Sequence, residues 1–190
     1  SSSNSEWKPW DVAFTGHWTP KVNDIIYDET GQKKIGSAYT ASKHTSELYA
    51  DKAINYLMTE VKKLDKPFFM YVAFNAPHDP RQSPKEFVDK YPSSKIKIPE
   101  NYLEEHPFDQ GDHKIRDEKL APFPRTKEAV QLHRSEYYAI ITHFDRELGR
   151  ILKALEASGK ADNTYVILSS DHGLAVGQHG LMGKQNQYDH

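Results

Sequence analysis

The sequence has 190 residues, 37% hydrophobic and 12% aromatic, which is enough apolar material for one core. Its 25 Lys and Arg and 27 Asp and Glu give a formal charge of -2, and the basic residues are spread along the sequence, which argues against a nucleic-acid-binding surface. No apolar run approaches the ~20 residues of a membrane span, and no segment has the pattern of a signal peptide. Without cysteine, disulfides within the sequence are excluded.

The first half of the sequence changes from polar to strongly apolar. Residues 1–41 show no sustained periodicity and predict an irregular segment with loops and a hairpin. Over residues 42–64, apolar side chains recur at three- and four-residue steps, which predicts an amphipathic helix. The unbroken apolar run at residues 68–74 then predicts a strand buried on both faces of a sheet.

The second half predicts a long loop, a long helix and another strand. Residues 77–125 show no long period, and we expect them to wrap the rim of an active site and shape a substrate pocket. Thr126 can cap a helix that runs to Ala157, and residues 164–168 form an apolar run that predicts a strand. The order helix, strand, long loop, helix, strand predicts a mostly parallel sheet flanked by helices over residues 42–190. The apolar stripe expected on the long helix comprises Val130, Tyr137, Ile141, Phe144, Leu148, Ile151, Leu152 and Leu155.

Chemically distinctive residues follow this last strand. The motif Ser-Ser-Asp171-His172-Gly comes first, then Gly-Gln-His179-Gly, then Gly-Lys184. An isolated Asp-His-Gly is more often a simple turn, but the two motifs that follow favour a site at the carboxyl edge of a sheet. Calcium and magnesium prefer oxygen ligands, so Asp171 is the firmer candidate metal ligand and His172 the second. Metal, lysine and histidine together indicate a site for an anionic ester.

These motifs also carry a family resemblance. With the upstream run Phe69-Met-Tyr-Val-Ala-Phe-Asn-Ala-Pro-His-Asp-Pro80, residues 43–190 resemble the sulfatase family, in the branch of iduronate-sulfatase-like and bacterial polysaccharide sulfatases. The resemblance implies an alkaline-phosphatase-like α/β fold, present here only in part, with Ca²⁺ or in some members Mg²⁺. It also implies a nucleophile made by oxidising Cys or Ser to formylglycine. The implied substrate is a sulfated carbohydrate or small sulfate ester, and the implied location is periplasmic, secreted or lysosomal.

The resemblance assigns roles to individual residues. His78 matches a family histidine that contacts the sulfate and protonates the departing alcohol, and the prolines beside it favour a stiff loop. Lys184 matches a lysine that holds a sulfate oxygen and offsets negative charge in the transition state. His179 could reach the substrate or could only hydrogen-bond its own loop, and both readings stay open. A solvated or core role is expected for the remaining histidines, His17, His44, His106, His113, His133, His143 and His190.

The family's nucleophile motif, Cys or Ser followed by x-Pro-x-Arg, has no match in this sequence. The nearest strings are Ser83-Pro84-Lys85 and Phe123-Pro124-Arg125, and the Asp-Asp metal pair of the family is also missing. We therefore interpret residues 1–190 as an internal part of a single sulfatase catalytic domain, inactive alone and partnered by the remainder of its parent polypeptide. Two alternatives stay open, a phosphonate or phosphodiester hydrolase of the same superfamily and a noncatalytic module that binds an anion or metal.

Overall fold

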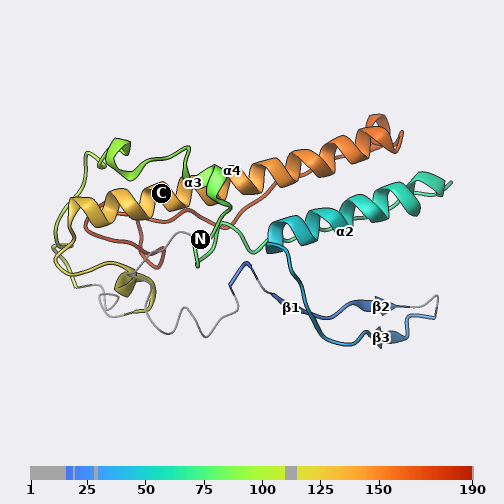
Figure 1. Ribbon diagram of the computed structural model, residues 1–190, viewed down its shortest axis with the longest axis horizontal. Helices are drawn as coiled ribbons and strands as arrows, with labels where there is room; N and C mark the ends of the chain where they lie inside the picture. Colours follow the sequence, from blue (N-terminus) through green and yellow to red (C-terminus); the bar gives the residue numbers. More distant parts are fainter. Residues whose placement is uncertain (1–15, 19, 28–29, 110–114, 190) are drawn as a thin grey trace. The chain divides into compact units, whose positions relative to one another are not determined.

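The computed structural model describes residues 16–18, 20–27, 30–109 and 115–189 (Figure 1). The chain divides into two compact units. Among the described residues, unit 1 comprises 84–109, 115–139 and 165–189, and unit 2 comprises 16–18, 20–27, 30–83 and 140–164. The long helix α4, Lys127–Ala157, therefore contributes its first part to unit 1 and its second part to unit 2.

Unit 2 begins with short antiparallel ribbons. Strand β1, Lys21–Val22, pairs with β4, Tyr39–Thr40. Between them, β2, Ile25–Tyr27, pairs with β3, Lys33–Ile35. The loops and hairpin predicted for the start of the sequence are confirmed for the described residues.

Two helices build the core of unit 2. Helix α2, Thr45–Thr59, lies within the predicted range and is followed by a 3-10 turn at Val61–Lys63. The His44 side chain caps α2 by accepting a hydrogen bond from the Ser46 amide at 3.1 Å. One face of α2 packs against the second part of α4, and burial of this apolar surface stabilises the unit. The buried side chains of this core are Ala50, Ala53, Leu57, Val61, Ile151, Ala154 and Leu155.

Helix α4 begins where the sequence predicts. The Ala129 amide donates to Thr126 Oγ1 at 3.2 Å, which confirms the predicted cap. The buried face, however, departs from the predicted apolar stripe, because Ile141 is exposed whereas His143 and Glu147 are fully buried. These polar side chains are tolerated there because Arg146, Arg150 and the carboxylate of Glu47 lie beside them in unit 2.

The strand predicted at residues 68–74 is not formed. Phe68, Met70, Val72 and Phe74 pack against the core of unit 2, while Phe69 and Tyr71 are 88% and 81% exposed. This period of two is typical of a strand with one face on a helix layer. The prediction of burial on both faces is wrong, because only one face is covered, and the described residues supply no ladder partner for this segment.

The strand predicted at residues 164–168 is also absent, and its apolar side chains are open to solvent. Tyr165 is 98% and Ile167 is 88% exposed. Within the described residues the paired strands are short and antiparallel, so the parallel sheet predicted over residues 42–190 is not formed. The helices and the unpaired candidate strand segments of this chain therefore make up only part of an α/β fold.

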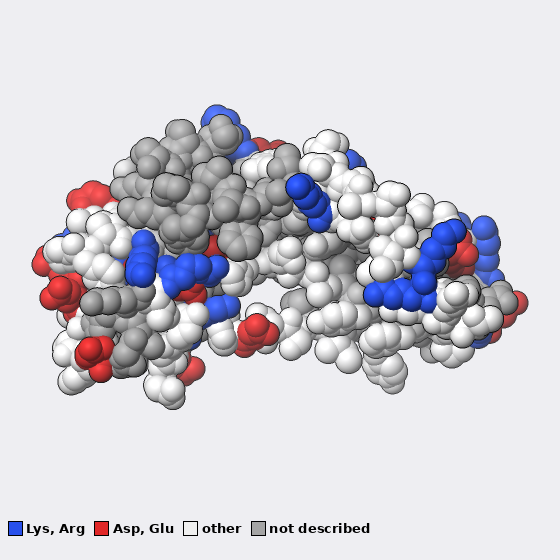
Figure 2. Space-filling view, turned by 90° about the horizontal axis from the view of Figure 1, so that it is seen from below, with Lys and Arg blue, Asp and Glu red and all other residues white. Residues whose placement is uncertain are grey.

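Residues 77–125 are mostly irregular, as predicted. They contain the short helix α3, Lys85–Val88, and 3-10 turns at Ser93–Lys95 and Asp117–Leu120, with a further turn at Ala161–Asn163 after α4. In Figure 2, Lys and Arg side chains lie close to Asp and Glu side chains on the described parts of the surface. In the described part of the chain, no helix combines the length and apolarity needed to cross a bilayer.

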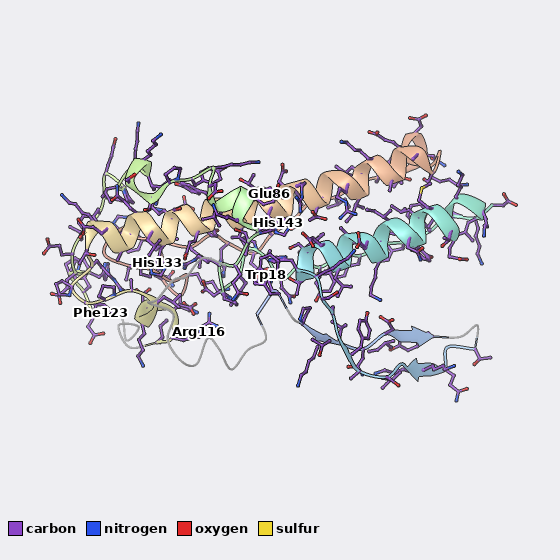
Figure 3. The ribbon with its side chains drawn as sticks, in the orientation of Figure 1. Trp18, Glu86, Arg116, Phe123, His133 and His143 are labelled. Atoms are coloured by element: carbon purple, nitrogen blue, oxygen red, sulfur yellow. The ribbon has the colours of Figure 1, made fainter. Side chains whose placement is uncertain are left out.

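Three buried histidines meet at the start of α2. The His17 and His44 rings stack with centroids 4.9 Å apart, and the His143 ring meets His44 edge-on at 4.5 Å. Trp18 lies across His44 at 5.3 Å, and Figure 3 shows Trp18 and His143 near this end of the helix. Burial lowers the pKa of His44 to about 4 and that of His143 to about 3, so both rings are neutral near pH 7.

Acid should therefore destabilise unit 2 as the pH falls below about 6.5. An unfolded histidine gains its proton near pH 6.5, whereas His143 stays neutral in the folded state down to about pH 3. Stability contributed by neutral burial is present above pH 6.5 and is lost as pH falls, with a slope of roughly 1.4 kcal/mol per pH unit for each such group. The charged groups facing His143 are Glu47, Glu147 and Arg146.

The measurement is urea unfolding between pH 6.5 and 5, for the unaltered protein and for His143→Gln. The free energy of unfolding should fall with pH in the unaltered protein, and the slope should be shallower in the variant, because glutamine takes up no proton. Equal slopes for the two proteins would show that His143 is not a neutral buried group.

Candidate active site

Asp171 and His172 lie on the surface of unit 1. Both side chains are exposed, and His172 Nδ1 lies 3.3 Å from the Gly173 carbonyl oxygen. Within the described part of the chain, no hydrogen bond or ion pair reaches the Asp171 carboxylate. Its oxygens are therefore available to a cation.

The following loop, residues 175–183, closes on itself through its backbone. The Ala175 amide donates to the Gly183 carbonyl at 2.9 Å, and the Gly177 amide donates to the Leu181 carbonyl at 2.7 Å. Gly177 has φ 95°, and a Cβ at this position would lie 2.3 Å from Val130 Cγ1 of α4. Only glycine fits there, because a side chain would meet both backbone strain and a steric clash.

A buried ion pair holds this loop from inside unit 1. The Glu118 side chain accepts from the Met182 amide at 2.9 Å and from the Gly183 amide at 2.8 Å, one bond to each carboxylate oxygen. Arg125 pairs with the same carboxylate and donates to the Gly180 carbonyl at 3.0 Å. The segment immediately before Lys184 is therefore fixed by two charged side chains from the long irregular region.

Both members of this pair are almost fully buried. Arg125 also donates to the Glu118 and Ala121 carbonyl oxygens, at 2.7 Å and 2.9 Å, which adds satisfied hydrogen bonds around the guanidinium. Burial lowers the pKa of Arg125 from its usual value, and the Glu118 charge opposes that shift. Sequence reasoning missed the pair, since two charges in an irregular segment look the same as solvated surface charges until the fold buries them.

His179 is held from outside its own loop. Its Nε2 lies 3.0 Å from Asn101 Nδ2, and its backbone amide donates to the Asn101 carbonyl at 2.9 Å. His106 Nδ1 donates to the His179 carbonyl at 2.8 Å, and the Tyr188 ring stacks on the imidazole at 4.0 Å. The ring therefore bonds to a distant segment of unit 1 and does not merely tie its loop to itself.

Lys184 directly follows the clamped segment. Its side chain is half-buried, and its amide donates to Gln185 Oε1 at 3.3 Å. Gln185 in turn donates to Asp117 Oδ2 at 3.0 Å. Among the described residues, no hydrogen bond or ion pair occupies the Lys184 ammonium, so it can receive an anion.

His78 lies in unit 2, exposed, on a loop supported by buried histidines. His17 Nε2 donates to the His78 carbonyl at 3.1 Å, and His44 Nε2 donates to the Gln82 carbonyl at 2.9 Å. A buried Arg81–Asp79 pair, with Nε and Oδ1 3.2 Å apart, adds a second support. The stiff loop predicted around His78 is consistent with these contacts, and the core role expected for His17 and His44 is confirmed.

The predicted residues are divided between the units, with Asp171, His172, His179 and Lys184 in unit 1 and His78 in unit 2. Their convergence on one substrate stays a prediction.

A separate group of metal-type ligands in unit 2 joins Glu47, Glu147 and His143 within 4.8 Å. Its carboxylates are already matched by guanidiniums, since Arg146 lies 2.8 Å and Arg150 2.5 Å from Glu147 oxygens, so we interpret it as an ion-pair network between α2 and α4.

Glu118→Gln should destabilise the protein strongly. The change leaves the buried Arg125 guanidinium without its counter-charge, and breaking such a pair typically costs about 3–5 kcal/mol. The matched control is Lys85→Ala, which removes a solvent-exposed pair with Asp89 and should change the free energy of unfolding by less than about 1 kcal/mol. Urea unfolding measures both, and equal small losses would contradict a structural role for the buried pair.

Comparisons with known proteins place the chain in a family. The sulfatase family model matches residues 7–190. An arylsulfatase of Clostridium perfringens is 29% identical over 152 residues, covering 80% of this chain and 31% of that protein. Human iduronate 2-sulfatase is 30% identical over 145 residues, covering 70% of this chain and 26% of that protein. The chain thus spans about a third or less of the length of these curated relatives.

Solved structures agree with this placement. The yidJ sulfatase of Bacteroides fragilis superposes with a TM-score of 0.61 at 25% identity, covering 88% of this chain and 32% of that one. A Bacteroides thetaiotaomicron protein from work on glycosaminoglycan metabolism gives a TM-score of 0.55 at 25% identity, covering 86% of this chain and 29% of that one. The fold is the alkaline-phosphatase-like fold of the sulfatases, present in part. The chain belongs to the sulfatase family.

Proposed function

We propose that the protein containing this chain hydrolyses a sulfate ester on a sugar. The observation that carries the proposal is the clamped loop of unit 1, which fixes the segment before Lys184 and follows the exposed Asp171-His172 pair. A sulfated sugar is supported by the names of relatives, which include iduronate 2-sulfatases, and by the structural neighbour from glycosaminoglycan metabolism. A periplasmic, secreted or lysosomal location belongs to the same proposal.

Sulfatases use a divalent metal and formylglycine, and the metal proposed here is Ca²⁺, with Mg²⁺ as the alternative. Asp171 and His172 would hold it, and the available carboxylate of Asp171 is the hard oxygen donor that either ion prefers. These two side chains fall short of the about 6–8 ligands that calcium takes, so other ligands must come from outside this pair. When bound, the ion would offset negative charge on the sulfate oxygens.

The chain's own residues would act on the ester oxygens. The Lys184 ammonium would bind a nonbridging sulfate oxygen and stabilise the charge that grows there in the transition state. His78, exposed on a supported loop, would donate a proton to the bridging oxygen as the alcohol leaves. This sequence contains no formylglycine motif, so the 190-residue chain alone would be inactive.

A phosphonate or phosphodiester hydrolase is the second candidate. A multifunctional alkaline phosphatase superfamily protein of Trinickia caryophylli is 25% identical over 191 residues and covers 91% of this chain. The discriminating measurement is kcat/KM of the full-length enzyme on nitrophenyl sulfate, a nitrophenyl phosphodiester and a nitrophenyl phosphonate. Preference for the sulfate supports the sulfatase proposal, and preference for either phosphorus ester contradicts it.

The two proposed catalytic side chains should respond differently to the leaving group. His78→Ala should slow a sugar sulfate by about 10²-fold or more and largely spare nitrophenyl sulfate, whose phenolate departs without a proton. Lys184→Ala should slow both substrates, because the sulfate oxygens are common to both. Rates of both full-length variants on both substrates test this, and equal losses for His78→Ala would remove its role as an acid.

The metal assignment is tested at Asp171. Asp171→Asn keeps the shape of the side chain and removes an anionic ligand, so calcium should be needed at much higher concentration for activity in the full-length enzyme. Asp162→Asn, an exposed carboxylate after α4, is the matched control and should leave the calcium titration unchanged. An unaltered titration for Asp171→Asn would exclude Asp171 from the metal site.

A further inference from the structure

We propose that Asn101 is a positioning residue that fixes the tautomer of His179, so that the imidazole presents a protonated Nδ1 to a sulfate oxygen. The inference rests on the proposed function, because it takes the sulfate ester as the group that His179 meets. It assigns His179 to the donors of the substrate site, one of the two readings that its sequence motif leaves open.

Asn101 contacts His179 through both its backbone and its side chain. The Asn101 carbonyl accepts from the His179 amide at 2.9 Å, and Asn101 Nδ2 lies 3.0 Å from His179 Nε2. The same segment joins the loop through an antiparallel bridge between Tyr102 and Gln178. The side-chain contact thus belongs to a short, defined pairing of two chain segments within unit 1.

The amide orientation determines which imidazole nitrogen carries the proton. In the structure the Asn101 amide directs Nδ2 both to Gln178 Oε1, at 3.3 Å, and to His179 Nε2, at 3.0 Å. An amide nitrogen is only a donor, and therefore His179 Nε2 must accept. In the neutral ring the proton then lies on Nδ1, which becomes a hydrogen-bond donor.

The backbone of His179 is held in an unusual conformation by its surroundings. His179 has φ 54°, in the left-handed region that residues other than glycine seldom adopt. His106 donates to its carbonyl at 2.8 Å, and a Cβ on the neighbouring Gly180 would lie 2.7 Å from the His106 amide nitrogen. Strain of this kind persists where the surroundings impose it, and it recurs at functional sites.

The free edge of the ring can still meet a ligand. Tyr188 stacks on one face of the imidazole with the planes 11° apart, and the side chain remains partly exposed. In the described part of the chain, Nδ1 has no hydrogen-bond partner. A ring fixed in rotation, with one nitrogen satisfied and the protonated one free, is preorganised to donate to an anion.

The experiment compares Asn101→Asp with the matched control Asn163→Asp in the full-length enzyme. The first change replaces the donor to Nε2 by an acceptor at nearly constant volume, whereas the exposed Asn163 lies in unit 2 after α4. Nitrogen NMR of the His179 ring should show unprotonated Nε2 and protonated Nδ1 in the unaltered enzyme and in the control, and protonated Nε2 with unprotonated Nδ1 in Asn101→Asp. Thermal melting verifies that both variants are folded.

Kinetics supply the second readout. Asn101→Asp should lower kcat/KM on the sulfate ester by about tenfold or more, the size expected for losing a charge-assisted hydrogen bond. The same change should have little further effect in a His179→Ala background, because it acts through that ring. An unchanged ring tautomer, or equal losses in both backgrounds, would overturn the inference. No sulfate-ester hydrolysis by the unaltered enzyme would instead contradict the proposed function, and the NMR signal would still decide whether Asn101 sets the tautomer.

Discussion

The Glu118 carboxylate is the constraint on which the functional loop of unit 1 depends. It receives the amides of Met182 and Gly183 and the guanidinium of Arg125, so its charge is satisfied entirely by groups that position the loop. A buried charge is stable only when its partners are in place. The loop conformation is therefore coupled to the ion pair, and Lys184 begins from a fixed backbone. A site that must place a positive charge against a transition state benefits from such preorganisation.

The loop of His78 is held by two neutral histidines as well as by a buried ion pair. His17 donates a hydrogen bond to the His78 carbonyl oxygen, and His44 donates one to the Gln82 carbonyl oxygen. Burial keeps the pKa of His44 near 4. The support in unit 1 is an ion pair, whereas the support in unit 2 combines two neutral histidines with the buried Arg81–Asp79 pair. Proton uptake by His44 would add a buried charge beneath the His78 loop, whereas Glu118 and Arg125 already balance each other.

Sequence periodicity predicted the helices well, because a long amphipathic stripe and a capping Thr126 are local features. It could not show whether the predicted strands pair, since a strand forms only with a partner, and residues 68–74 and 164–168 have no ladder partner among the described residues. The motifs pointed to the loop around His179 and Lys184, and the role of these two residues in a site stays a prediction. No sequence pattern identifies Glu118, Arg125 and Asn101 as residues that position this loop. A polar residue in an irregular segment shows its role only once it contacts residues that are distant in the sequence.

We infer that the buried Glu118–Arg125 pair makes the loop before Lys184 rigid. Hydrogen exchange of the Met182 and Gly183 amides in the full-length protein tests it most directly, since both amides donate to Glu118. We expect exchange as slow as that of buried amides in α4, because the loop can open only when the ion pair breaks. Exchange as fast as at the exposed Gln187 would contradict the claim and leave Lys184 on an unsupported loop.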